Sequence, residues 1–166
     1  MLIKKKIGNI KDYDVDNKFI DRLQLQWYET NKRILHKKTT SGKEIILKFF
    51  KENQQLTEGD ILFEDSTTII AVEILPCDAI IIKPKNDFEI AAACYEIGNK
   101  HLPLFFCDDE LLIAFEEPLY NLLNAAGYNV KRGERKLIMP LKTSVKAHAS
   151  LSLDPLFTAA SNINKF

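Results

Sequence analysis

Hydrophobic and polar residues alternate or form short apolar runs over the first 75 residues of the chain, which is typical of strands. Five segments are rich in β-branched and aromatic residues: LQLQWYET, RILHKKTT, KEIILKFF, DILFED and TTIIAVEIL. The segments TSGK, TEGD and EDST between them carry turn-forming residues. The pattern predicts an all-β domain over residues 1–75.

The pattern changes near Pro76. PCDAIIIKP has the length and composition of a short apolar strand, and NDFEIAAACYEIG is typical of a helix with Asn86 or Asp87 as its N-cap. The apolar face of this helix is predicted to contain Ile90, Cys94 and Ile97, widened by Ala91 and Ala93. We expect the helix to end near Gly98, because glycine adopts the left-handed conformation of a C-terminal cap at little cost.

The remaining pattern completes a second domain over residues 76–139. LPLFFC and ELLIAF predict two strands joined by Asp108 and Asp109, EEPLYNLLNAAG predicts a helix that Gly127 ends, and YNV and KLIM are candidates for a last strand. The order strand, helix, strand, strand, helix, strand is the ferredoxin-like βαββαβ arrangement. The predicted fold class is therefore α+β.

From Pro140 onward the sequence loses its periodicity and gains small polar residues. Residues 140–166 are therefore predicted to form a flexible tail, which contains His148.

The net charge of the chain does not indicate a binding partner. Its 23 basic and 23 acidic residues cancel, so no overall field draws it to a nucleic acid or to an anionic membrane. The opening MLIKKKIGNI is not followed by the apolar core of a signal peptide, and no run approaches the length of a membrane span. We expect a cytoplasmic protein.

The sequence does not favour an enzyme. Cys77, Cys94 and Cys107 lack CxxC spacing, and core packing is the expected role of all three. A cysteine–histidine hydrolase would need one of these thiols beside His101 or His148, and no local signature supports one. No GxxxxGK[ST] phosphate-binding motif is present.

His101 follows the exit of the first predicted helix. A helix C-terminus carries a partial negative charge, so a cation is favoured there, although an isolated histidine after a helix is commonly a capping or surface residue. One histidine cannot hold a metal ion alone, but a two-fold symmetric dimer would bring two copies of His101 together. His148 is a candidate further ligand, and neutral imidazole suits nickel, copper and zinc alike.

Two segments resemble a known family. CYEIGNKHLPL, residues 94–104, is similar to the signature of the UreE family of urease accessory metallochaperones, in which a helix ends in Gly-Asn-Arg/Lys-His. TNKRILHKKTTSGKEIILKF and LTEGDILF, within residues 30–63, resemble the first domain of that family. The resemblance covers roughly residues 1–140.

The resemblance implies a β-rich domain that binds protein partners, a ferredoxin-like metal-binding domain, and a homodimer in which two copies of His101 share one nickel ion. It further implies delivery of nickel to the urease apoprotein together with an accessory GTPase, and it allows His148 as a tail ligand. Zinc or copper are possible substitutes for nickel in vitro. The alternative hypothesis is a metal-independent module in which the β domain binds a peptide or protein and His101 is incidental.

Overall fold

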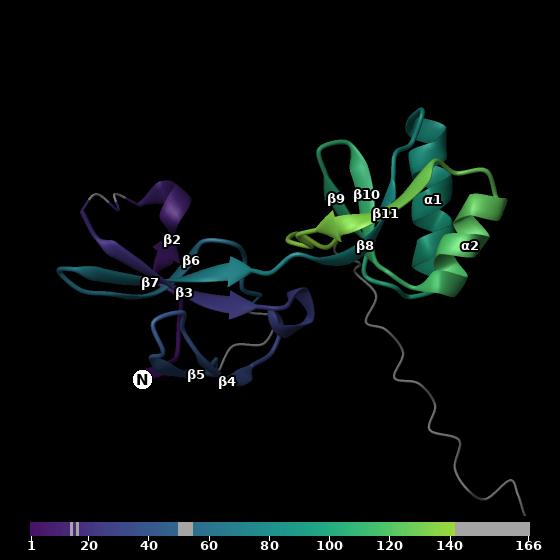
Figure 1. Cartoon of the computed structure of the whole chain (residues 1–166). Coiled ribbons are helices and arrows are strands. Elements are labelled where there is room, and N and C mark those ends of the chain that lie inside the picture. Colours follow the sequence, from purple (N-terminus) through teal and green to yellow (C-terminus); the bar gives the residue numbers. More distant parts are fainter. Residues whose placement is uncertain (14, 16, 50–54, 142–166) are drawn as a thin grey trace, which may run out of the picture.

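The computed structural model describes residues 1–13, 15, 17–49 and 55–141. In this part of the chain a β-rich region comes first and a region of four strands and two helices follows it (Figure 1). Residues 140–166 are predicted to form a tail, and from residue 142 onward this prediction lies outside the described residues.

The described residues of the β-rich region form two sheets and two 3-10 helices. Sheet A has the strand order β1-β5-β4 and consists of β1 (Leu2–Ile3), β4 (Ile34–Lys38) and β5 (Glu44–Lys48). Sheet B has the order β2-β6-β7-β3 and consists of β2 (Gly8–Asn9), β3 (Phe19–Leu25), β6 (Asp60–Glu64) and β7 (Thr68–Ile74). The short helices are η1 (Ile10–Asp12) and η2 (Trp27–Glu29).

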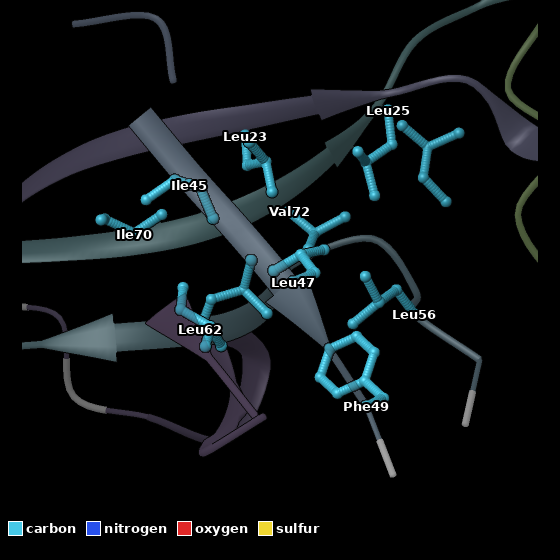
Figure 2. Close-up of a cluster of buried hydrophobic side chains, with 11 residues drawn as sticks. Leu23, Leu25, Ile45, Leu47, Phe49, Leu56, Leu62, Ile70 and Val72 are labelled. Atoms are coloured by element: carbon cyan, nitrogen blue, oxygen red, sulfur yellow. The ribbon is translucent and has the colours of Figure 1, made fainter. Parts of the chain in front are cut away.

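The two sheets enclose an apolar core. In β5, Ile45 and Leu47 face inward while their neighbours Glu44 and Lys48 are exposed, as strand alternation requires. Figure 2 shows these side chains meeting those of sheet B, among them Leu23, Leu25, Leu62, Ile70 and Val72. Each buried Leu or Ile contributes about 1.5–3 kcal/mol relative to an exposed one, so this core is a major source of stability for the region.

Four of the five strand predictions in this region are confirmed, since β4, β5, β6 and β7 lie within RILHKKTT, KEIILKFF, DILFED and TTIIAVEIL. The prediction for LQLQWYET is wrong beyond Leu25, where the chain turns into η2. The cause is Glu29, whose carboxylate accepts hydrogen bonds from the backbone N–H of Gln26 at 2.9 Å and from Lys37 Nζ at 2.6 Å. These bonds cap η2 and hold the turn.

The second region has the predicted βαββαβ order. It consists of β8 (Cys77–Ile82), α1 (Asp87–Asn99), β9 (Phe105–Cys107), β10 (Glu110–Ala114), α2 (Glu117–Ala125) and β11 (Val130–Arg135). Its four strands form sheet C in the order β11-β8-β10-β9, with every neighbouring pair antiparallel. The α+β fold class is confirmed.

Most of the cap and turn residues predicted at the ends of these elements are also confirmed. Asn86 is the N-cap of α1, and its side chain accepts a hydrogen bond from the backbone N–H of Glu89 at 2.9 Å. Asp108 and Asp109 form the two-residue turn between β9 and β10, both with positive φ. Of the two candidates for the last strand, YNV contains Val130, the first residue of β11, whereas KLIM follows β11 and is not a strand. β11 has the charged sequence VKRGER and lies at the edge of sheet C.

Sheet C is apolar on both faces. Ile80 and Ile82 of β8 pack on one face with Ala93 and Ile97 of α1. Ala79 and Ile81 point to the other face, which holds no helix and lies toward the β-rich region (Figure 1). Within the described ranges, no helix is long and apolar enough to cross a membrane.

Glu29 provides a test of how η2 is held. Burial opposes its ionisation, but the hydrogen bond from Lys37 and that from the Gln26 N–H outweigh burial, so the pKa of Glu29 lies below its ordinary value of 4.5. A carboxylate with a lowered pKa in the folded state stabilises the fold above its unfolded pKa, and this contribution is lost as pH falls through the folded pKa. Glu29→Ala should lower the free energy of unfolding at pH 7 by about 1.5–3 kcal/mol.

The measurement is urea unfolding of wild type and Glu29→Ala at pH 7 and at pH 3. The difference between the two proteins should shrink at pH 3, because this pH lies below the ordinary pKa of 4.5 and the unfolded wild-type chain binds a proton there more readily than the folded one. An equal difference at both pH values would show that the charge of Glu29 is irrelevant.

Candidate metal-binding site

His101 occupies an unusual backbone position at the exit of α1. The helix ends at Asn99, Lys100 is its C-cap, and His101 follows with a φ of 56°. The backbone N–H of His101 donates a hydrogen bond to the carbonyl oxygen of Gly98 at 2.9 Å. The prediction that Gly98 takes the left-handed conformation is therefore wrong: Gly98 lies inside α1, and the histidine itself is the left-handed residue.

A left-handed histidine is costly. A residue with a Cβ pays about 1–2 kcal/mol in this conformation, which glycine would avoid. The strain fixes the direction in which the side chain leaves the backbone, and the side chain of His101 is exposed at the negative end of the helix dipole. The imidazole is thus held at a defined place on the surface, where a cation is favoured.

One described chain does not complete a metal site. Among the residues that the structure describes, no group of three His, Cys, Asp or Glu side chains lies close enough to hold a metal ion. The predicted second ligand, His148, lies outside the described residues. A metal ion bound by His101 would need further ligands from outside the described part of this chain.

An exposed apolar stripe runs along α1 toward His101. Phe88 is 82% exposed and Tyr95 is 73% exposed, and Ala91 lies exposed between them. Spacings of three and four residues place the three on one helix face. The prediction that Ala91 belongs to the packed face is wrong, and the seven-residue spacing of the two aromatic residues is the signal for this stripe that sequence reasoning missed.

The environments of the three cysteines do not favour metal binding. The prediction of core packing is confirmed for Cys77 and Cys94, which are half-buried against apolar clusters, and burial raises the pKa of each thiol. It is wrong for Cys107, which is exposed. The hydrogen bond from its Sγ to Asp108 at 3.4 Å raises the pKa of this thiol too. Because the thiolate is the metal-binding form, these shifts disfavour all three.

The end of the described chain lies against β9, the strand that follows His101. Pro140 is bridged to Phe105 in the antiparallel sense, and the backbone N–H of Leu141 donates to the carbonyl oxygen of Leu104 at 2.7 Å. The last two described residues, Pro140 and Leu141, therefore lie beside Phe105 and Leu104, close in sequence to His101.

Comparison with known proteins identifies the family. Residues 3–75 match the N-terminal domain of the UreE urease accessory protein, and residues 77–140 match its C-terminal domain. This chain belongs to the UreE family. It is 41% identical over 165 residues to the urease accessory protein UreE of Flavobacterium johnsoniae, a match that covers 99% of this chain and 100% of that protein.

Other UreE proteins match over less of the chain. The UreE protein of Haemophilus influenzae strain PittEE is 40% identical over 147 residues, which cover 86% of this chain and 80% of that protein. The UreE protein of Acetivibrio thermocellus is 36% identical over 141 residues, which cover 85% of this chain and 92% of that protein. The family resemblance predicted from CYEIGNKHLPL is confirmed, and His101 lies in the segment matched to the UreE C-terminal domain.

The backbone strain at His101 can be measured without metal. His101→Gly and His101→Ala both remove the imidazole, but only glycine relieves the left-handed strain. His101→Gly should therefore be more stable than His101→Ala by roughly 0.5–1 kcal/mol, a difference of about 2–3 °C in Tm. The measurement is thermal unfolding in the presence of a chelator.

Asn99 supplies the matched control, because it is the last residue of α1 and is not among the residues with positive φ. There the order should reverse, with Asn99→Ala melting above Asn99→Gly, since glycine weakens helices. A lower Tm for His101→Gly than for His101→Ala would contradict the assigned conformation.

Proposed function

We propose that this protein is a nickel-binding metallochaperone that delivers nickel to the urease apoprotein, together with an accessory GTPase. Membership of the UreE family implies a role in urease maturation. The observation that carries the nickel-binding part is the exposed His101, held in a left-handed turn at the negative end of α1. Its imidazole is a ligand presented outward, and the protein acts as a carrier of the ion and not as a catalyst.

The complete site is proposed to form in a homodimer. An isologous two-fold contact through the α1 stripe of Phe88, Ala91 and Tyr95 would cover exposed apolar surface and bring the two copies of His101 toward the axis. The surface at Gly98 is open, because a Cβ built there would meet no atom within 4 Å. A second copy could therefore approach the end of α1 closely. Two imidazoles then donate one nitrogen each to a shared nickel ion.

His148 is proposed as the ligand that closes the site. The backbone N–H of Leu141 donates to the carbonyl oxygen of Leu104, three residues after His101. His148 follows Leu141 by seven residues in the sequence, and an extended chain of seven residues spans at most about 25 Å. This reach supports a contribution from His148, in its own site or in the shared one.

The proposed donor set suits transient binding. Imidazole nitrogen binds nickel, zinc and copper, so the ligand type favours nickel only in combination with the urease role. Few ligands at an exposed turn favour release over permanent retention. Because only the neutral form of imidazole binds a metal ion, nickel affinity should fall at acidic pH.

We further propose a role for each part of the chain. Residues 1–75 form a partner-binding domain, residues 76–139 form the metal-binding and dimerisation domain, and residues 140–166 form a tail. The setting is proposed to be the cytoplasm. Sheet A supports the first assignment, and equally the alternative of a metal-independent peptide-binding module, because Leu2 is 52% and Ile34 is 60% exposed on its outer face.

The first test is titration of nickel by calorimetry at pH 7.5, with light scattering on the same samples. Wild type should form dimers and bind one nickel ion per two chains at the shared site. His101→Ala removes both central ligands at once and should lose this binding. Titration at pH 5.5 should show weaker binding by wild type.

His36→Ala is the matched control, because His36 lies on β4 in the other region and its removal should leave nickel binding unchanged. Full-strength binding by His101→Ala would contradict the proposal. Partner binding that persists in chelator and in His101→Ala would favour the metal-independent alternative.

The proposed dimer face has its own test. Tyr95→Glu places a charge in the exposed stripe, where burial against a second copy would be costly. This variant should be monomeric by light scattering at a concentration where wild type is dimeric, and it should lose the nickel ion shared between chains. Tyr28→Glu, an equally drastic change at a tyrosine 55% exposed on the β-rich region, should remain dimeric. A dimeric Tyr95→Glu would place the interface elsewhere.

A further inference from the structure

Sheet A has one buried face and one outer face. Ile3, Ile45 and Leu47 lie in the buried core of the β-rich region. Because side chains alternate along a strand, the residues next to them in the sequence point outward. Within the described residues, both α-helices pack on sheet C and neither lies on this outer face (Figure 1). The outer face of sheet A is therefore open to a partner.

The centre of this outer face is apolar. Leu2, Ile46 and His36 form a row across the three strands, because the strand register places them side by side. Ile34 lies two residues before His36 on β4 and faces the same way. Leu2 is 52% exposed and Ile34 is 60% exposed. Since the apolar face of a sheet is normally buried against another element, these side chains mark a contact surface.

The charge around the apolar centre is basic. Lys48 is paired with Ile34 in the strand register, and Lys38 is paired with Glu44. The segment 32–48 contains six Lys or Arg residues and a single acidic residue, although the whole chain is balanced at 23 of each. That acidic residue, Glu44, forms an ion pair with Lys38 at 3.4 Å. The face is thus complementary in charge to an acidic partner.

A hollow of about 260 Å³ lies where β4 and β5 meet. Its lining consists of three register pairs, two of which face outward with the third between them. The pairs are His36 with Ile46, Lys38 with Glu44, and Lys37 with Ile45. The hollow therefore opens between the apolar row and the basic rim, where one side chain of a partner can enter.

The backbone of the sheet favours a helical partner. The central strand β5 is paired on both sides, so its backbone groups are already satisfied. A segment on the outer face therefore meets side chains only, and it must satisfy its own backbone hydrogen bonds, as a helix does. The five residues of β4 span roughly 17 Å, which a helix of about three turns matches in length.

We propose that the outer face of sheet A docks an acidic amphipathic helix of a protein partner. This inference rests on the partner-binding role proposed for residues 1–75, and it names the chemistry of that partner. The apolar side chains of the helix lie on Leu2, Ile34 and Ile46, and one of them enters the hollow. Its carboxylates meet Lys38 and Lys48 at the rim.

The test is fluorescence anisotropy of the full chain with a synthetic peptide as the probe. The probe is a labelled peptide of about 14 residues, with leucine at helical spacings of three and four residues and with glutamate and alanine elsewhere. It should bind wild type, and the affinity should fall several-fold when salt is raised from about 0.05 M to about 0.5 M.

Two control peptides separate charge and shape from general stickiness. One has lysine in place of every glutamate. The other has the composition of the probe with its leucines at every second position, so it lacks an apolar helix face. Each should bind wild type at least about 10-fold more weakly than the probe.

Two substitutions examine the centre and the rim. Ile34→Glu places a carboxylate in the apolar centre and should weaken binding of the probe about 10-fold or more. Lys48→Glu reverses a rim charge, so it should weaken the probe about 5-fold and strengthen binding of the lysine peptide. A merely structural defect would weaken both peptides, which makes the opposite response of the lysine peptide decisive.

Matched control variants lie on other sheets. Phe19 is 60% exposed, like Ile34, but it begins β3 in sheet B, so Phe19→Glu should bind the probe as wild type does. Lys131→Glu on β11 is the corresponding control for charge and should also bind normally. Circular dichroism checks the fold of each variant, and Ile34→Ser, a milder change, replaces Ile34→Glu if the latter does not fold.

Four outcomes would overturn the proposal. They are the absence of probe binding by wild type, equal binding of the lysine peptide, and normal probe binding by both the Ile34 and the Lys48 variants. The fourth is an Ile34-dependent contact with something else: vesicles containing phosphatidylserine would assign the face to a membrane, and loss of dimers in Ile34→Glu would assign it to a second copy.

Failure of this inference is distinguishable from failure of the proposed nickel function. Ile34→Glu and Lys48→Glu should bind nickel as wild type does, because both residues lie on sheet A. Absence of nickel binding by wild type would refute the carrier function whatever the peptides do. Absence of probe binding with intact nickel binding would overturn only the docking of an acidic helix.

Discussion

The structure depends on the need to cover both faces of sheet C. The run AIII in β8 sends large apolar side chains to each side, so neither face can be left in water. The helices α1 and α2 cover one face, and Trp27 and Leu137 pack on the other. Separation of the β-rich region would expose the cluster around Ile81 and Phe105 at a cost of about 1.5–3 kcal/mol for each large side chain. The two regions therefore share a core, although each has one of its own.

Local signals in the sequence were sufficient for most of the fold. The alternation in β5, the N-cap Asn86 and the aspartate turn after β9 are decided by neighbours in the chain, and such features can be predicted from a short window. The turn η2 could not be predicted in this way. Its sequence WYE is suited to a strand, and the turn is held by Glu29, which caps the N–H of Gln26 and also accepts a hydrogen bond from Lys37 on β4, eight residues further along the chain. Charged residues in β11 hid an edge strand for the related reason that an edge needs few apolar side chains.

The candidate site was predictable only in part. The motif around His101 locates the turn at the end of α1, but a rule that assigns left-handed positions to glycine selects Gly98, because it cannot foresee that α1 continues to Asn99. The stripe of Phe88 and Tyr95 escapes a search for one apolar face, since α1 is apolar on the opposite face too, where Ala93 and Ile97 pack on the sheet. Within the described residues, α1 therefore has a second apolar face that no other element covers. A contact with a second copy, as proposed above, would be visible in one sequence only through such an uncovered face.

The bridge between Pro140 and Phe105 also bears on solubility. β9 is the outermost strand of sheet C, and an open strand edge is a template for pairing with other chains. Pro140 and Leu141 lie along this edge, and proline has no N–H to offer on its own outer side. The sheet therefore ends at a residue that cannot propagate it, which protects the strand beside His101 from edge-to-edge aggregation when the protein is concentrated.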